Sequence, residues 1–329
     1  MLSRVADSLY WMSRYLERAE HTARLVDVQL NQMLDQAGGE TNLRWQQLPR
    51  SLRMPQPEGE VDAYSVTQML TFDVGNSLSI VSCIASAREN ARQVRELISS
   101  EMWEQLNRLF LKVKEASMQQ IWYGEPHRYL NSVKEGIYLF QGITDATMSH
   151  SEGWHFIRVG RFLERATGTA ALLDEHFAAF TTPLAAPGED ESEPLDYLSW
   201  VGLLKSCASF EAYCTVYTAV IRPANIAEFL LLNAEAPRSI RFSCAMMQGA
   251  LQAIAKSTGA RNPGRVERII GRLRAALDYD QIEEIFGGDM HEYLENIRRQ
   301  CGQIHSGLYQ TYIAYPIEVA LTSRGAAQE

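Results

Sequence analysis

The sequence predicts an all-α protein, a helical bundle of roughly ten to twelve helices built from two pseudo-symmetric repeats. A second apolar stripe, from Phe156 to Phe177, repeats the first one 147 residues later. Strand signals are weak, because no alternating runs of Val, Ile and Thr bounded by hairpin turns occur. The first stripe has alternating spacings of four and three, which only a helix produces, and consists of Val5, Leu9, Met12, Leu16, Ala19, Ala23, Val26, Leu30 and Met33.

The internal repeat continues beyond these two helices, with an offset that only grows. Growth of the offset is expected if the second half has longer loops. We therefore expect one domain over residues 1–329, with halves 1–147 and 148–329 that bury their apolar faces against each other. The matching segments are Leu43–Trp45 with Leu198–Trp200 at an offset of 155, Ser79–Ile80 with Ser239–Ile240 at 160, and Tyr129–Leu130 with Tyr293–Leu294 at 164.

Pro, Gly and acidic residues mark the breaks between the predicted helices. They gather in three segments, 48–59, 181–194 and 257–265. Between the breaks, residues 80–115 and 266–278 are expected to be helical.

Composition and charge exclude several classes of protein. A chain of 329 residues with 46% hydrophobic residues can bury a sizeable core. Its net charge of -9 argues against a protein that mainly grips nucleic acid or an anionic membrane, since both need a basic surface. No apolar run approaches the ~18 residues of a membrane helix, and the N-terminus lacks the apolar core of a signal peptide. A cytoplasmic location is expected.

Short chemical motifs are missing from the chain. The five cysteines show no metal-ligand spacing, so we expect buried free thiols. The seven histidines are scattered without a zinc or di-iron pattern, so no metal site is predicted. Neither a P-loop nor a dinucleotide fingerprint occurs, and no cofactor is predicted.

A charged Glu-Arg pair occurs in both apolar stripes, as Glu17-Arg18 and Glu164-Arg165. At 100° per residue, Glu17 and Arg18 lie about 140° and 120° from the centre of the stripe, on the back of the helix. That back face also carries aromatic and aliphatic residues, among them Tyr10, so the helix is expected to be covered on both sides.

Two interpretations of the pairs remain open. In the structural one, they satisfy each other within one helix or across the halves, as Glu17 with Arg165 and Glu164 with Arg18. In the functional one, they line a site in which arginines bind a carboxylate or phosphate and a glutamate binds an amine or moves a proton. Glu17, Arg18, Glu164 and Arg165 are then the candidate catalytic residues.

Several neighbours are candidate substrate-binding residues. Arg14 and His21 lie three and four residues from Glu17, at spacings where helical side chains meet. Arg161 is the counterpart of Arg14, whereas Gly168 stands where the first copy has His21. The charged helix 86–92 adds Arg88 and Glu89, for which a solvated helix face is the alternative.

Four long segments resemble the bacterial α-E family, which is named for an α-helical domain with a Glu-Arg motif: 1–28, 79–107, 142–167 and 227–242. The resemblance implies a role beside circularly permuted ATP-grasp ligases and transglutaminase-like proteins, in systems that make or attach peptides. Because this chain has no phosphate-binding motif, ligation chemistry would belong to the partner. We therefore expect a non-catalytic helical partner or substrate-holding module with a peptide or amino-acid ligand. The alternative is an enzyme that uses the paired Glu-Arg residues.

Overall fold

The computed structural model describes residues 1–35, 41–54, 61–180, 197–259 and 264–314. These residues form fifteen α-helices and no strand, so the all-α prediction is confirmed, although the chain is divided into more helices than the ten to twelve expected. The helices are α1 (Ser3–Asp35), α2 (Thr41–Ser51), α3 (Ala63–Thr71), α4 (Ile80–Gln93), α5 (Ser100–Glu115), α6 (Met118–Trp122), α7 (Pro126–Thr147), α8 (Glu152–Phe180), α9 (Tyr197–Ser206), α10 (Phe210–Tyr217), α11 (Pro223–Leu232), α12 (Ile240–Ser257), α13 (Arg265–Tyr279), α14 (Ile282–Gly287) and α15 (Met290–Leu308), followed by the π-helix η1 (Tyr309–Ile313).

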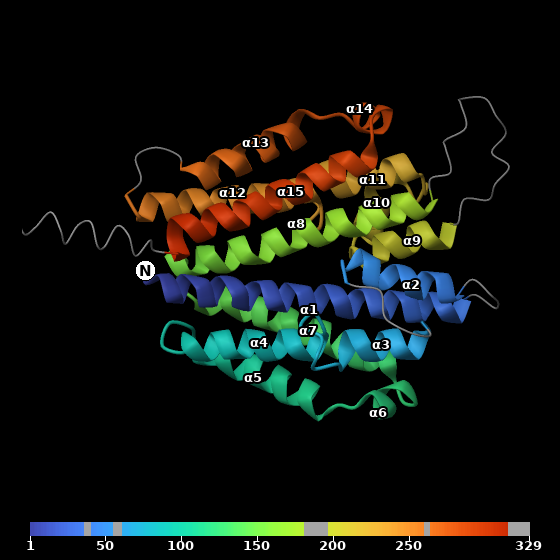
Figure 1. Ribbon diagram of the computed structural model, residues 1–329, viewed down its shortest axis with the longest axis horizontal. Coiled ribbons are helices and arrows are strands. Elements are labelled where there is room, and N and C mark those ends of the chain that lie inside the picture. The colour runs from blue at the N-terminus through green and yellow to red at the C-terminus, as the bar shows by residue number, and fades with distance from the viewer. Residues whose placement is uncertain (36–40, 55–60, 181–196, 260–263, 315–329) are drawn as a thin grey trace, which may run out of the picture.

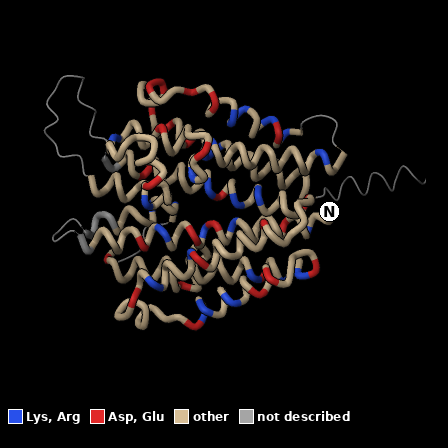
Figure 2. The backbone as a smooth tube through the Cα atoms, turned by 180° about the vertical axis from the view of Figure 1, so that it is seen from behind, with Lys and Arg blue, Asp and Glu red and all other residues tan. Residues whose placement is uncertain are grey.

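The two longest helices, α1 and α8, lie side by side in the middle of the molecule (Figure 1). Helices α3 to α7 lie on one side of this pair, and α11 to α15 lie on the other. One hydrophobic core runs through both halves. Charged residues are carried by the central helices as well as by the outermost ones (Figure 2).

Helix α1 is buried on both faces, as its sequence predicts. It packs against α4 and α7 of its own half and against α8, and residues of both its apolar stripe and its back face are buried. The back face buries Tyr10 and Leu25 completely or nearly so, and it buries Glu17 and Glu20 with them. These two carboxylates therefore need partners inside the protein.

The two central helices lie close together at Gly160 of α8. A Cβ atom at Gly160 would lie 2.4 Å from the carbonyl oxygen of Tyr10 and 2.3 Å from Oγ of Ser13. A residue with a Cβ atom at this position would therefore clash with the α1 backbone, whereas glycine fits. Gly160 follows Ser13 by 147 residues, so the crossing is made by residues at equivalent positions of the two stripes.

Several helix ends differ from the predicted ones. The expected helix 80–115 is interrupted at 94–99, where Ser99 accepts a hydrogen bond from the backbone of Met102 and begins a new helix. Helix α2 continues through Pro49 to Ser51, beyond the expected start of the break at residue 48. The segment 266–278 is helical as predicted, within α13. The predicted break at 181–194 lies outside the described residues.

The helices follow one another in the same order in both halves, apart from the additional α10. Helices α2 and α9 are each followed, two residues after their last residue, by a left-handed residue, Arg53 with φ 56° and Ala208 with φ 47°. These positions are 155 residues apart, the offset predicted for this part of the repeat. The overall twofold relation between the halves stays a prediction.

Candidate functional site

Glu17 of α1 is the centre of a buried ion-pair cluster. Arg165 of α8 donates to both of its carboxylate oxygens, from Nε at 2.6 Å and from Nη2 at 3.1 Å. Arg238, just before α12, donates a third hydrogen bond at 2.9 Å. Burial alone would raise the pKa of Glu17, but Arg165 and Arg238 outweigh it and lower that pKa. Glu17 is therefore held as a carboxylate.

Glu164, the matching residue of α8, pairs back onto α1. It accepts from Nε of Arg14 at 2.7 Å and from Nε of Arg18 at 2.6 Å. These arginines overcome the opposing effect of burial and lower the pKa of Glu164 to about 2. The cross-pairing of Glu17 with Arg165 and of Glu164 with Arg18 is confirmed, and it joins the two central helices.

Arg238 extends the cluster to a second buried carboxylate, Glu20. It donates to Glu20 at 2.5 Å, and Glu20 also accepts from Arg24 and Tyr138. This part of the cluster was not predicted. The available signal was that Arg238 stands, at the offset of 160, where the first half has Leu78, because an arginine in place of a core-type leucine needs a buried partner.

A pocket of about 240 Å³ opens beside these ion pairs, between α1 and α8. We call it the charged pocket. Five arginines line it against two glutamates, so its charge is positive in a chain whose net charge is negative. The Glu-Arg pairs thus join the halves and also line a pocket, which were alternatives at the level of sequence. Its lining is Arg14, Glu17, Arg18, His21, Thr22, Ser51, Leu52, Arg53, Leu78, Glu164, Arg165, Thr167, Gly168, Ala171 and Arg238.

Polar groups without protein partners face this pocket. Among the described residues, Arg18 uses only Nε in a hydrogen bond, which leaves both terminal nitrogens unpaired. The Nε2 atom of His21 is buried and has no hydrogen-bond partner. Burial, followed by the charge of Arg238, lowers the pKa of His21 to about 4, so the ring is neutral at pH 7. Gly168 leaves room for it, since a Cβ there would lie 3.3 Å from His21 Nε2.

Three residues that line the pocket have shorter side chains than their counterparts in the internal repeat. Leu78, Thr167 and Ala171 line it. At the offsets of 160 and 147, their counterparts are Arg238, Glu20 and Arg24. Those three longer side chains are hydrogen-bonded to one another. At these positions the halves differ, with shorter side chains in the first set and longer, hydrogen-bonded ones in the second.

The other candidate residues lie apart from the charged pocket. Arg161 approaches Glu17 only to 4.0 Å, and burial together with Arg165 lowers the pKa of its guanidinium to about 10. On α4, Arg88 donates to Asn107 at 2.7 Å. Glu89 is exposed and pairs with Arg92, as expected for a solvated helix face. None of these three candidates lines the pocket.

Two further ion-pair clusters tie each central helix to the last long helix of its half. Each contains an aspartate, a histidine and a basic residue at equivalent positions, with offsets of 147 and 164. Matching these offsets in the sequence would have found both. They consist of Asp27 with His127 and Lys134, at 2.8 and 2.6 Å, and Asp174 with His291 and Arg298, at 2.6 and 2.7 Å.

Groups suited to covalent or metal chemistry are not gathered at this site. Burial raises the pKa of Cys83 and of Cys207 to about 12, so both are protonated thiols at pH 7. In the described part of the chain, no three His, Cys, Asp or Glu side chains are grouped closely enough to hold a metal ion. The described helices also include none that is long and apolar enough to span a bilayer.

Fold and site together define an all-helical protein in which two central helices, each with a Glu-Arg pair, enclose a charged pocket. The chain belongs to the Alpha-E family, described as "a predicted alpha-helical domain with a conserved ER motif", which matches residues 1–313. This chain has two Glu-Arg dipeptides that take part in the ion pairs at the pocket, Glu17-Arg18 and Glu164-Arg165.

Similar proteins are known from mycobacteria. An uncharacterized protein of Mycobacterium bovis and one of Mycobacterium tuberculosis are each 24% identical to this chain over 339 aligned positions, which cover 95% of this chain. The chain spans 37% of the length of each of these relatives. No solved structure matches it.

Proposed function

We propose that the protein is a non-catalytic module that holds the carboxylate end of a peptide or amino acid for an ATP-grasp-dependent ligation system. The observation that carries this proposal is the charged pocket, with five arginines against two glutamates. Because Glu17 and Glu164 already accept hydrogen bonds from arginines, the remaining capacity is that of a hydrogen-bond donor and a positive charge. Such a pocket suits an anion, and a guanidinium fork matches a carboxylate.

The ionisation states of the glutamates in the charged pocket favour a site that holds a substrate over one that reacts with it. A general acid or base works best with a pKa near the operating pH. Glu164 has a pKa of about 2 and Glu17 a lowered one, so neither exchanges protons readily at pH 7. His21 is neutral, and among the described residues its Nε2 atom has no hydrogen-bond partner that would orient the ring. The alternative of an enzyme built on the Glu-Arg pairs therefore has less support.

A partner supplies the ligation chemistry in this proposal. The resemblance to the α-E family points to a circularly permuted ATP-grasp protein and a transglutaminase-like protein as companions. The mycobacterial relatives give modest support, since the region similar to this chain is part of a polypeptide more than twice as long. In such an arrangement, a holding module and a second domain can act on one substrate.

Calorimetric titration with acetylalanine and its amide tests the binding step. We expect the acid to bind and the amide to bind at least tenfold more weakly, since only the acid offers a carboxylate. Arg18→Gln removes the unpaired donors and should abolish binding, while Glu164 keeps Arg14 as a partner. Arg53→Gln, at the half-exposed rim, should weaken binding without changing folding. Arg92→Gln on the surface of α4 is the matched control.

The partner step has its own test. Mixing the protein with the companion ATP-grasp ligase should increase ligation of a carboxylate substrate, and the Arg18→Gln variant should not. Equal binding of acid and amide, or carboxylate binding unaffected by Arg18→Gln, would show that the charged pocket is not the binding site. Ligation that proceeds equally well without this protein would contradict its role in ligation and leave carboxylate binding intact.

A further inference from the structure

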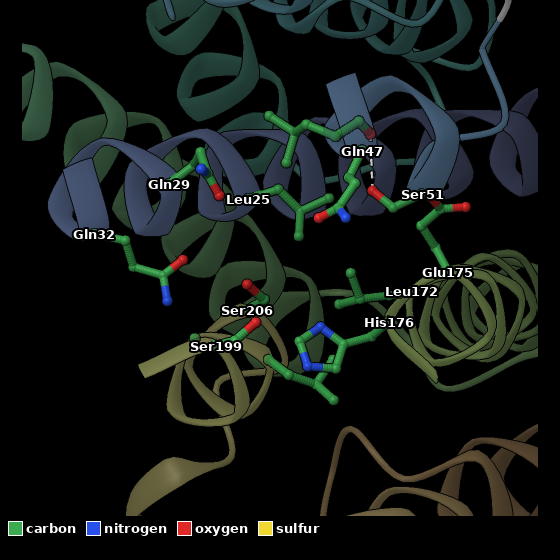
Figure 3. A pocket seen from close by; sticks show the side chains of 13 residues that line it. Leu25, Gln29, Gln32, Gln47, Ser51, Leu172, Glu175, His176, Ser199 and Ser206 are labelled. Carbon is green, nitrogen blue, oxygen red and sulfur yellow. Dashed lines mark hydrogen bonds between the residues drawn. The ribbon is translucent and has the colours of Figure 1, made fainter. Parts of the chain in front are cut away.

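A second, smaller pocket of about 70 Å³ adjoins the charged pocket at the end of α2. We call it the amide pocket. Ser51 lines both pockets. Figure 3 shows Gln47 and Ser51 of α2 on one side of it and His176, Ser199 and Ser206 on the other. The complete lining is Leu25, Gln29, Gln32, Gln47, Leu48, Ser51, Leu172, Glu175, His176, Ser199, Gly202, Leu203 and Ser206.

The two pockets lie end to end along the seam between α1 and α8. On α1, their lining residues follow one helix face at spacings of three and four, from Arg14 in the charged pocket to Gln32 in the amide pocket. On α8, Glu164, Gly168 and Ala171 line the first, and Glu175 lines the second, again at spacings of four, three and four. One elongated ligand could therefore contact both.

The amide pocket differs chemically from the charged one. Its polar groups are mainly side-chain amides and hydroxyls, each of which can both donate and accept a hydrogen bond. Among the described residues, the amides of Gln29 and Gln47 have no protein hydrogen-bond partner, although Gln29 is only 9% exposed. Peptide groups present one donor and one acceptor per residue. Unpaired glutamines thus match a peptide backbone better than an anionic or apolar ligand.

From this arrangement we infer that the two pockets together hold an extended peptide, with its C-terminal carboxylate at Arg18 and its backbone amide groups along Gln29 and Gln47. The inference rests on the proposed carboxylate-binding function and specifies its substrate class. Arg18 and Gln29 are eleven residues apart on one helix, or about 16 Å at 1.5 Å per residue. An extended chain covers this distance with about five residues.

Titration with a length series tests the inference. The probes are acetylated oligoalanines of one to six residues with free carboxylates. Affinity should rise with length and level off at about five residues, because further residues lie beyond Gln29. Gln47→Leu removes one donor and acceptor, so it should weaken the pentamer roughly 3- to 10-fold and leave acetylalanine unchanged.

Two further variants keep this result interpretable. Ser206→Ala should act like Gln47→Leu, and because the Ser206 hydroxyl has no hydrogen-bond partner among the described residues, this variant is expected to fold normally. Gln119→Leu on α6 is the exposed control. Arg18→Gln should weaken probes of every length.

The outcomes separate this inference from the proposed function. Arg18-dependent binding with no gain beyond one residue would overturn the extended peptide and leave carboxylate binding intact. Equal weakening of acetylalanine and the pentamer by Gln47→Leu would also overturn it. If no probe bound in an Arg18-dependent way, both the inference and the proposed function would fail.

Discussion

Glu17→Gln should destabilise the protein strongly even though it changes only one atom. Glu17 is 1% exposed and accepts three hydrogen bonds from Arg165 and Arg238. A glutamine leaves both buried guanidiniums short of one negative charge and turns an N–H donor toward them. Removing one partner of a buried ion pair costs about 3–5 kcal/mol. With an unfolding entropy of roughly 2.1 cal/mol/K per residue, a chain of 329 residues should lose about 4–7 °C in Tm.

Differential scanning calorimetry of the variant measures this loss. Glu89→Gln is the matched control, because Glu89 also pairs with an arginine but is exposed, and its Tm should move by less than about 1 °C. The combined Glu17→Met and Arg165→Met variant should recover part of the loss, since it leaves no stranded charge from that pair. Equal Tm shifts for Glu17→Gln and Glu89→Gln would refute the reasoning that buried cross-pairing holds the halves together.

Two further predictions concern the pocket and the helix crossing. Because the pKa of His21 falls to about 4 in the folded protein from about 6.5 when unfolded, its contribution to stability is present above pH 6.5 and is lost as the pH falls toward 4. The free energy of unfolding should fall by at most about 3 kcal/mol through this effect. Urea unfolding at a series of pH values from 7 to 4 measures the fall. A His21→Gln variant with the same pH profile as the unchanged protein would contradict the prediction. Gly160→Ala forces a Cβ against the Tyr10 carbonyl and should cost at least about 1–3 kcal/mol. Gly142→Ala in α7, where a Cβ meets nothing within 4 Å, should be neutral or stabilising, and equal Tm values for the two variants would show that the crossing is not tight.

Much of the central architecture could be predicted, because it depends on periodic local patterns. The spacing of Leu9, Met12 and Leu16 predicts a helix and its buried face, and the repeated stripe predicts a second one. Placing Glu17 and Arg165 on the back faces of equivalent helices made their pairing one of the possibilities, and the structure confirms it. The break at 94–99 was missed, since these residues contain no proline or glycine.

Contacts between segments that are far apart in the sequence could not be predicted at the site. Arg238 lies 221 residues from Glu17, and nothing local to either residue indicates their contact. The space beside the Glu-Arg pairs is lined by residues of separate segments, among them Leu78 before α4 and Thr167 and Ala171 of α8. A pocket is the volume left after all neighbouring side chains have packed, so its existence is a property of the assembled structure.

By itself, the sequence determined the helical class, the two central helices and the burial of both their faces, and it offered cross-pairing of the Glu-Arg motifs as one of two interpretations. These properties follow from helix geometry and from the cost of burying an unpaired charge, and both act through residues at fixed spacings. Only the tertiary structure decided that Arg238 and Glu20 join the cluster, that one charged pocket is open, and that unpaired glutamines continue it. These features depend on which side chains from separate helices meet and on how completely they fill the space between α1 and α8.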